Sequence, residues 1–124
     1  MKAIYKLNLD CGREGSLYGI FIADKEYVDV LVNNDIEVYF GEILGKHSDI
    51  SLTINDTDLE LITDDVKVID MFEEYELSTG INPFDYNASD FYYDSIGLID
   101  NGNIIIYDIV EQIIEYNKSM NDKG

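Results

Sequence analysis

Basic side chains are scarce in this sequence of 124 residues. Lys and Arg number eight together, Arg13 is the only arginine, and 26 Asp and Glu residues leave a formal net charge of −18. Proteins bind nucleic acid largely because Lys and Arg displace counterions from the phosphates, and an anionic protein is repelled by phosphates and by anionic membranes. The composition therefore argues against direct binding to nucleic acid and against binding to a membrane.

Cysteine and histidine occur once each, as Cys11 and His47. A single cysteine forms no internal disulfide, and one Cys with one His is too few for an all-protein zinc site. The two side chains could form a nucleophile and its base, but the sequence shows no orienting group or oxyanion site beside them. We expect Cys11 to be a buried, inert thiol and His47 to lie in a turn, and we predict no enzymatic activity and no cofactor.

Long apolar runs are also missing. No stretch approaches the about 18 apolar residues of a membrane-spanning helix, and the first residues lack the apolar segment of a signal peptide. The sequence therefore predicts a cytoplasmic protein. Hydrophobic residues make up 46% of the chain, which is enough for one core, so we expect a single acidic domain over residues 1–124, with about the last five residues frayed.

Alternating apolar and polar residues in the first half of the chain predict strands that pair as hairpins. The expected strands are residues 3–11, 17–23, 36–44, 48–55 and 58–62. Turns are expected at residues 12–15 and 45–47, where glycines interrupt the alternation. Asp24 is placed to cap a helix that ends near Asn34.

The second half of the chain carries signals for two more helices. Thr63 or Asp64 is placed to cap the first of them, and Gly80 followed by Pro83 is expected to end it. Hairpins interleaved with single helices predict an α+β fold, a mainly antiparallel sheet with two or three helices packed on one face.

Residues 81–93 are predicted to form a loop. The sequence Asp-Asn-Gly at residues 100–102 predicts a hairpin with flanking strands at 95–99 and 103–107. Asp108 and Glu111 have the spacing of a capping box and predict the start of a last helix. In an alternative interpretation this helix already begins at Ile104.

Acidic residues are concentrated in the middle of the chain. Residues 56–100 hold 13 acidic residues and one basic residue, against 9 and 5 in residues 1–55 and 4 and 2 in residues 101–124. Asp85, Asn87 and Ser89 match the first, third and fifth ligands of an EF-hand loop. However, Asp90 stands where the loop requires Gly and Ile96 where it requires a bidentate Glu. We therefore predict no metal site.

Several of the ten tyrosines lie inside this acidic stretch. Aromatic residues are enriched at protein interfaces, and nearby carboxylates attract a basic partner and pair with its arginines. The residues expected to form such a partner-binding face are Asp70, Glu73, Glu74, Glu76, Asp85, Tyr86, Asp90, Tyr92, Tyr93 and Asp94.

Rows of carboxylates can imitate a nucleic-acid backbone, because those on successive helical turns lie about 5 to 6 Å apart. In size and charge the chain is similar to phage-encoded nucleic-acid mimics that block restriction or CRISPR effectors, a similarity that covers no motif. The sequence thus predicts an anti-defence inhibitor or decoy that occupies a basic groove of a nuclease or another nucleic-acid-binding protein. The alternatives are an acidic adaptor or regulatory protein that binds a partner by shape, and a carboxylate-based metal-binding protein or enzyme.

Overall fold

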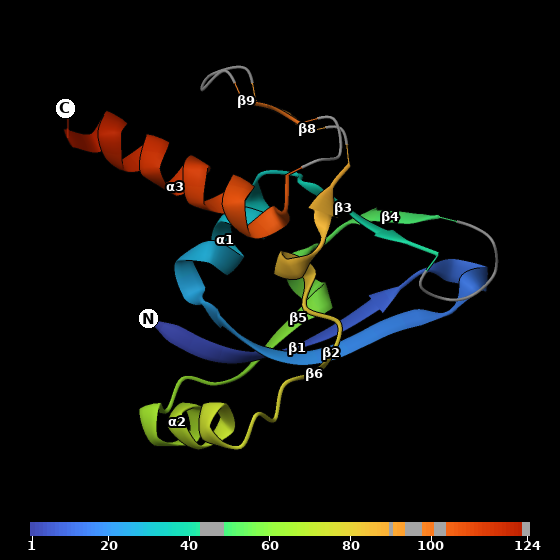
Figure 1. Ribbon diagram of the computed structural model, residues 1–124, viewed down its shortest axis with the longest axis vertical. Helices are drawn as coiled ribbons and strands as arrows, with labels where there is room; N and C mark the ends of the chain where they lie inside the picture. The colour runs from blue at the N-terminus through green and yellow to red at the C-terminus, as the bar shows by residue number, and fades with distance from the viewer. Residues whose placement is uncertain (43–48, 90, 94–97, 101–103, 123–124) are drawn as a thin grey trace.

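The computed structural model describes residues 1–42, 49–89, 91–93, 98–100 and 104–122. In these residues the strands form antiparallel sheets of four, three and two strands, with three α-helices around them (Figure 1). The predicted α+β fold is confirmed.

The largest sheet has the strand order β5-β1-β2-β6. β1 (Lys2–Asp10) and β2 (Ser16–Asp24) pair along their whole length, as their alternating residues predicted. β5 (Leu59–Thr63) pairs with the free edge of β1, and the two-residue strand β6 (Thr79–Gly80) pairs with β2. The first hairpin and the strand predicted at 58–62 are confirmed.

The second sheet has the order β4-β3-β7. β3 (Glu37–Gly41) and β4 (Ile50–Thr53) form the second predicted hairpin, and β7 (Asn87–Ala88) pairs with the other edge of β3. The turn expected at 45–47, with His47, lies outside the described residues.

Helices α1 (Lys25–Asn33) and α3 (Ile106–Asp122) pack against each other on one side of the large sheet (Figure 1). The side chain of Asp24 caps α1, because its Oδ1 accepts a hydrogen bond of 3.0 Å from the backbone N–H of Glu26. α3 buries one apolar face completely, and this face, with the inward residues of both sheets, forms the core. Its fully buried residues are Ile106, Ile109, Val110 and Ile113.

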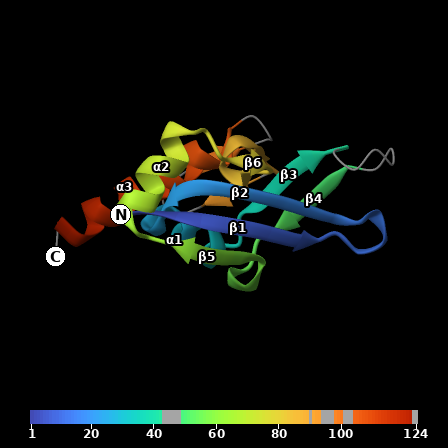
Figure 2. The ribbon, with the colours of Figure 1, turned by 90° about the horizontal axis from the view of Figure 1, so that it is seen from below.

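Helix α2 (Val66–Glu74) lies on the opposite face of the large sheet, where Figure 1 shows it apart from α1 and α3; in Figure 2, seen from below, it overlaps α3 and lies nearer the viewer. Ile4 of β1 and Ile69 of α2 are both buried, yet neither belongs to the main core. Because side chains alternate along a strand, Ile4 also points to the opposite face of the sheet from Ala3 and Tyr5. The helices therefore cover both faces of the sheet, and the expectation that they share one face is wrong.

Both ends of α2 differ from the prediction. Its N-cap is Asp65, whose Oδ1 accepts a hydrogen bond of 2.9 Å from the N–H of Lys67. The helix ends at Glu74, well before Gly80. The cause is Glu76, which adopts the left-handed backbone conformation, with φ of 51°, that normally favours glycine after a helix.

The segment predicted as a loop at 81–93 contains regular structure. A 3-10 turn (η3, Pro83–Asp85) precedes β7, and β8 (Phe91–Tyr93) pairs with β9 (Leu98–Asp100). The hairpin predicted with strands at 95–99 and 103–107 is therefore wrong. The alternative start near Ile104 is closer, since α3 begins at Ile106.

Tertiary contacts decide this outcome. The N–H of Ile106 donates a hydrogen bond of 2.7 Å to the carbonyl of Tyr86, and the N–H of Ala88 donates one of 3.0 Å to the carbonyl of Ile104. These bonds place Ile106 in the core at the start of α3. Asp108 consequently lies inside the first turn of the helix and does not cap it.

Candidate functional site

The structure separates the residues predicted to form one partner-binding face. Asp70, Glu73 and Glu74 are exposed on α2, and Glu76 is exposed just after it. β8, which contains Tyr92 and Tyr93, lies at the other end of the molecule from α2 in Figure 1. Asp90 and Asp94 lie outside the described residues.

The remaining two predicted residues lie at the end of η3. Asp85 is exposed, whereas Tyr86 is half-buried, with its ring centroid 5.1 Å from that of Phe40. Burial raises the pKa of Tyr86, and the charge of Asp85 adds to this shift. Tyr86 thus packs at the edge of the core.

Helix α2 exposes apolar side chains next to its carboxylates. Val68, Met71 and Tyr75 are 38%, 48% and 66% exposed, at the i, i+3 and i+7 positions that share one helical face. On the same element Glu73 is paired with Lys2, with 3.5 Å between Oε1 and Nζ. The surface of α2 is therefore mixed, partly apolar and partly acidic.

A second acidic surface, which the sequence analysis did not single out, lies on α3. Asp108, Glu111 and Glu115 follow each other at helical spacing and border one shallow, open hollow on the surface. We call it the α3 hollow, and it is lined by Ile104, Asp108, Glu111, Gln112 and Glu115. The helical spacing is visible in the sequence, but the spacing of Asp108 and Glu111 also fits a capping box, which is what the sequence predicts there.

The carboxylates of the α3 hollow have no basic partner in the part of the chain that the structure describes. The ion pairs found there join Lys2 to Glu73, Lys25 to Asp64 and the N-terminal amine to Asp24. Like charges three or four residues apart on a helix destabilise it by about 0.2 to 0.5 kcal/mol per pair. The hollow therefore carries uncompensated negative charge on a rigid element.

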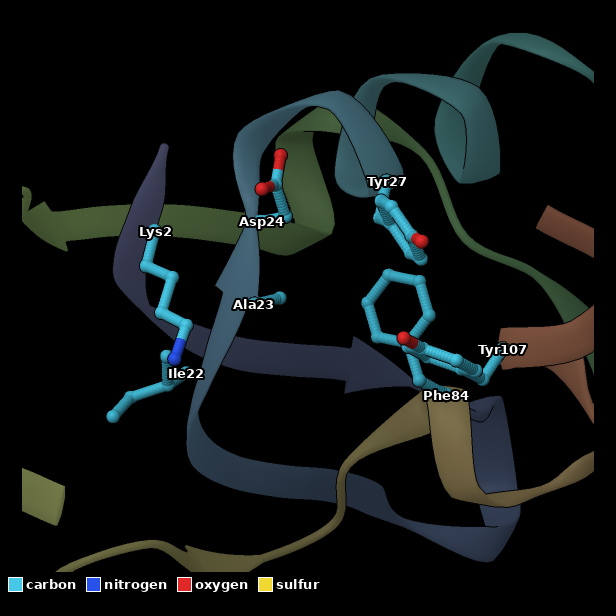
Figure 3. A pocket seen from close by; sticks show the side chains of 7 residues that line it. All are labelled: Lys2, Ile22, Ala23, Asp24, Tyr27, Phe84 and Tyr107. Atoms are coloured by element: carbon cyan, nitrogen blue, oxygen red, sulfur yellow. The ribbon is translucent and has the colours of Figure 1, made fainter. Parts of the chain in front are cut away.

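A small pocket lies beside this surface, between β2 and the first turns of α1 and α3 (Figure 3). Its volume is about 240 Å³, and we call it the tyrosine pocket. It is lined by Lys2, Ile22, Ala23, Asp24, Tyr27, Phe84 and Tyr107. Figure 3 shows the rings of Tyr27, Phe84 and Tyr107 together on one side of β2, with Ala23 pointing toward them and with Lys2 and Ile22 on the other side of this strand.

The local structure of each element places these three rings. Asp24 caps α1, which puts Tyr27 in its first turn, and the buried Ile106 fixes Tyr107 at the start of α3. The centroids of these two rings are 5.2 Å apart. Asn82 Oδ1 accepts a hydrogen bond of 3.0 Å from the N–H of Phe84 and so closes the η3 turn that carries the third ring.

The tyrosine pocket has a negative electrostatic environment at the Tyr27 hydroxyl. Burial, the hydrogen bond with Tyr107, and the negative charges of Glu111 and Asp24 together raise the pKa of Tyr27 to about 12. Glu111 also borders the α3 hollow. Glu111 therefore borders the hollow and also contributes negative charge at the pocket.

The remaining sites considered from the sequence are the Cys11 thiol and the EF-hand-like residues that begin at Asp85. The sequence predicts a buried thiol at Cys11, but Cys11 is only partly buried. Its Sγ lies 3.7 Å from the carbonyl oxygen of Leu9. Asp85 and Asn87 do not lie in one calcium loop, because the first belongs to η3 and the second pairs with β3 as part of β7. Among the described residues no group of three or more His, Cys, Asp or Glu side chains is arranged to hold a metal ion.

No helix in the described part of the chain is long and apolar enough to cross a membrane. Comparisons of the chain with protein families, with curated proteins and with solved structures gave no match.

Proposed function

We propose that the protein is a non-enzymatic, cytoplasmic binding protein that occupies a basic groove of a nucleic-acid-binding or defence protein and acts as its inhibitor or decoy. The α3 hollow carries this proposal. Its three carboxylates lie on one rigid helix without a basic partner among the described residues, and they repel one another in the absence of a ligand. A groove that binds phosphates supplies the missing positive charge.

The test is whether nucleic acid and salt compete with the protein for its target. The purified protein is immobilised on beads and incubated with a lysate of its source cells at about 50 mM salt. The bound proteins are then washed with duplex DNA, with RNA, or with about 500 mM salt. We expect to capture a nucleic-acid-binding protein that is released by the high-salt wash and by DNA, by RNA or by both. A partner that stays bound under all of these conditions would contradict the proposal.

Two matched double variants locate the binding surface. Glu111→Gln with Glu115→Gln removes two of the three carboxylate charges of the α3 hollow, and Asp70→Asn with Glu74→Gln removes the same number of charges from α2. The α3 variant is expected to weaken binding of the captured partner about threefold to tenfold, the effect of losing two exposed ion pairs, and the α2 variant less. Equal affinity of the α3 variant and the wild type would exclude the α3 hollow as the binding surface.

A second candidate function, an adaptor that binds by shape, is favoured by the exposed apolar face of α2. Burial of Val68, Met71 and Tyr75 against a partner would give an affinity that depends little on salt. In that case Met71→Gln with Tyr75→Gln would abolish binding at every salt concentration, and the α3 double variant would leave it unchanged.

A further inference from the structure

The tyrosine pocket has the size of a site for one side chain. Pockets that bind small molecules and cofactors typically have volumes of about 300 to 1,000 Å³, and the volume here is about 240 Å³. The pocket is open to solvent, and Tyr107 in its lining is 44% exposed. A long side chain from another protein can therefore enter.

The lining of the pocket favours a flat cation. The rings of Tyr27, Phe84 and Tyr107 offer faces on which a guanidinium group stacks, and Ala23, which points toward the rings from β2, offers an apolar contact to its methylene chain. Arginine engages aromatic faces in this way more often than lysine does.

The charges around the pocket point to the same ligand. The negative charges of Glu111 and Asp24 oppose ionisation of Tyr27, and the same field attracts a cation. The positive groups at the rim already have partners, because the N-terminal amine pairs with Asp24 at 3.2 Å and Lys2 pairs with Glu73 at 3.5 Å. Glu111 has no basic partner among the described residues and remains available to an incoming guanidinium.

We propose that the tyrosine pocket receives one arginine side chain of the basic partner, stacked on the tyrosine rings and paired with Glu111. This inference rests on the proposed function and makes it more specific. The α3 hollow attracts a basic surface in general, whereas the pocket selects a surface that presents an arginine at one position next to the hollow.

Short peptides test this directly. The probes are a blocked tetraarginine peptide and a blocked tetracitrulline peptide, which has the same shape without the charge, at about 150 mM salt, where long-range attraction is screened. We expect NMR shifts of the Tyr27 and Tyr107 rings with tetraarginine only, and upfield shifts of the arginine methylene protons that lie over an aromatic ring. Equal binding of both peptides, or tetraarginine binding without ring shifts, would overturn the proposal.

Variants separate the pocket from the general charge of the protein. Tyr107→Leu removes one ring and is compared with Tyr18→Leu, which removes an exposed tyrosine of β2 outside the pocket. Tyr107→Leu is expected to weaken tetraarginine binding about fivefold to thirtyfold, the range for loss of one cation–π contact, while Tyr18→Leu binds as the wild type does. If Tyr107→Leu fails to fold, Tyr27→Leu, which removes the other tyrosine ring of the pocket, is compared in the same way with Tyr39→Leu, which removes an exposed tyrosine of β3 outside the pocket.

The captured partner distinguishes failure of this inference from failure of the proposed function. If Tyr107→Leu binds the partner as tightly as the wild type, while the α3 double variant binds it more weakly, the pocket is not used and the proposed function stands. If a nucleic-acid-binding partner is captured and Tyr107→Leu weakens it in parallel with tetraarginine, both are supported.

Discussion

At the scale of single residues, Glu76 is the clearest conflict between side chain and backbone. It follows α2 in the left-handed conformation, where the N–H of Leu77 bonds to the carbonyl of Phe72 at 3.0 Å and the N–H of Glu76 to that of Glu73 at 3.2 Å. This is the hydrogen-bond pattern of a Schellman cap, whose left-handed position is usually glycine. A side chain there costs about 1 to 2 kcal/mol.

We therefore predict that Glu76→Gly stabilises the protein. Relief of the left-handed strain exceeds the extra entropy that glycine gives the unfolded chain, so the free energy of unfolding should rise by about 0.5 to 1 kcal/mol. Glu74→Gly is the matched control, because it removes the same charge inside the helix and should lower stability by about 1 kcal/mol. Urea unfolding measures both, and destabilisation by Glu76→Gly would show that the Glu76 side chain has a structural role.

Tyr27 gives a second prediction at this scale. Its pKa of about 12 means that the folded protein holds the neutral phenol. The raised pKa of Tyr27 therefore contributes to the free energy of unfolding. This contribution is complete below the ordinary pKa of 10 and is lost as the pH rises toward 12. Glu111→Gln and Tyr107→Phe should each lower the pKa of Tyr27 in a titration followed by ¹³Cζ NMR of the tyrosines. An unchanged pKa in both variants would mean that burial and the charge of Asp24 cause the shift without Tyr107 or Glu111.

At the scale of elements, two glycines allow β6 to approach β2 closely. A Cβ on Gly19 would lie 1.9 Å from the carbonyl oxygen of Ile81, and one on Gly80 would lie 2.4 Å from that of Tyr18. The N–H of Ile81 donates a hydrogen bond of 2.9 Å to the carbonyl of Tyr18. The chain after α2 therefore returns to the sheet only because both strands lack side chains at this point.

Gly19→Ala should consequently displace the chain at Ile81. We expect a loss of about 1 to 3 kcal/mol in the free energy of unfolding and faster hydrogen exchange of the Ile81 amide, because its bond to Tyr18 is broken. Gly12→Ala is the control, since a Cβ there meets no atom within 4 Å but stands at φ of 69°. It should lower stability by about 1 to 2 kcal/mol without changing local protection at Ile81. If hydrogen exchange of the Ile81 amide is unaltered in Gly19→Ala, the close approach of Gly19 to Ile81 is refuted.

Elements whose signals are local were predictable from the sequence. The strands β1 to β5 follow from alternation, and α1 follows from its cap at Asp24. The end of α2 was missed because Glu76 occupies a position where glycine is the usual signal. Residues 104–107 fit a strand as well as a helix, and a hydrogen bond to the distant Tyr86 decides between them.

The candidate site was predictable only in part. Helical spacing of Asp108, Glu111 and Glu115 is visible in the sequence, so the α3 hollow was within reach. The tyrosine pocket was not, because Tyr27, Phe84 and Tyr107 come from three segments that only the tertiary fold brings together. Proximity in the sequence places the acidic middle of the chain on one face, but in the fold the sheet lies between α2 and the helices α1 and α3, and β8 lies far from α2 (Figure 1).

At the scale of the whole molecule, the net charge of −18 acts on folding and on binding with opposite signs. Repulsion among carboxylates opposes the compact state, and salt screens it. Attraction to a basic groove is also screened by salt, which weakens the complex. Added salt should therefore stabilise the free protein while it weakens binding of the proposed partner.

We predict that the free energy of unfolding of the wild type rises between about 20 and about 300 mM sodium chloride. Glu111→Gln with Glu115→Gln removes two like-charge contacts on α3 and leaves Asp108 in the favourable first turn, so it should gain about 0.4 to 1 kcal/mol at the lower salt. Asp70→Asn with Glu74→Gln also removes two such contacts on α2, Asp70–Glu73 and Asp70–Glu74, but it removes the attraction between Asp70 and Lys67 as well, so it should gain about half as much. Both gains should shrink at the higher salt concentration. A fall in wild-type stability with added salt would show that attractive ion pairs outweigh repulsion in the folded protein, which would remove the uncompensated charge on which the proposed binding depends.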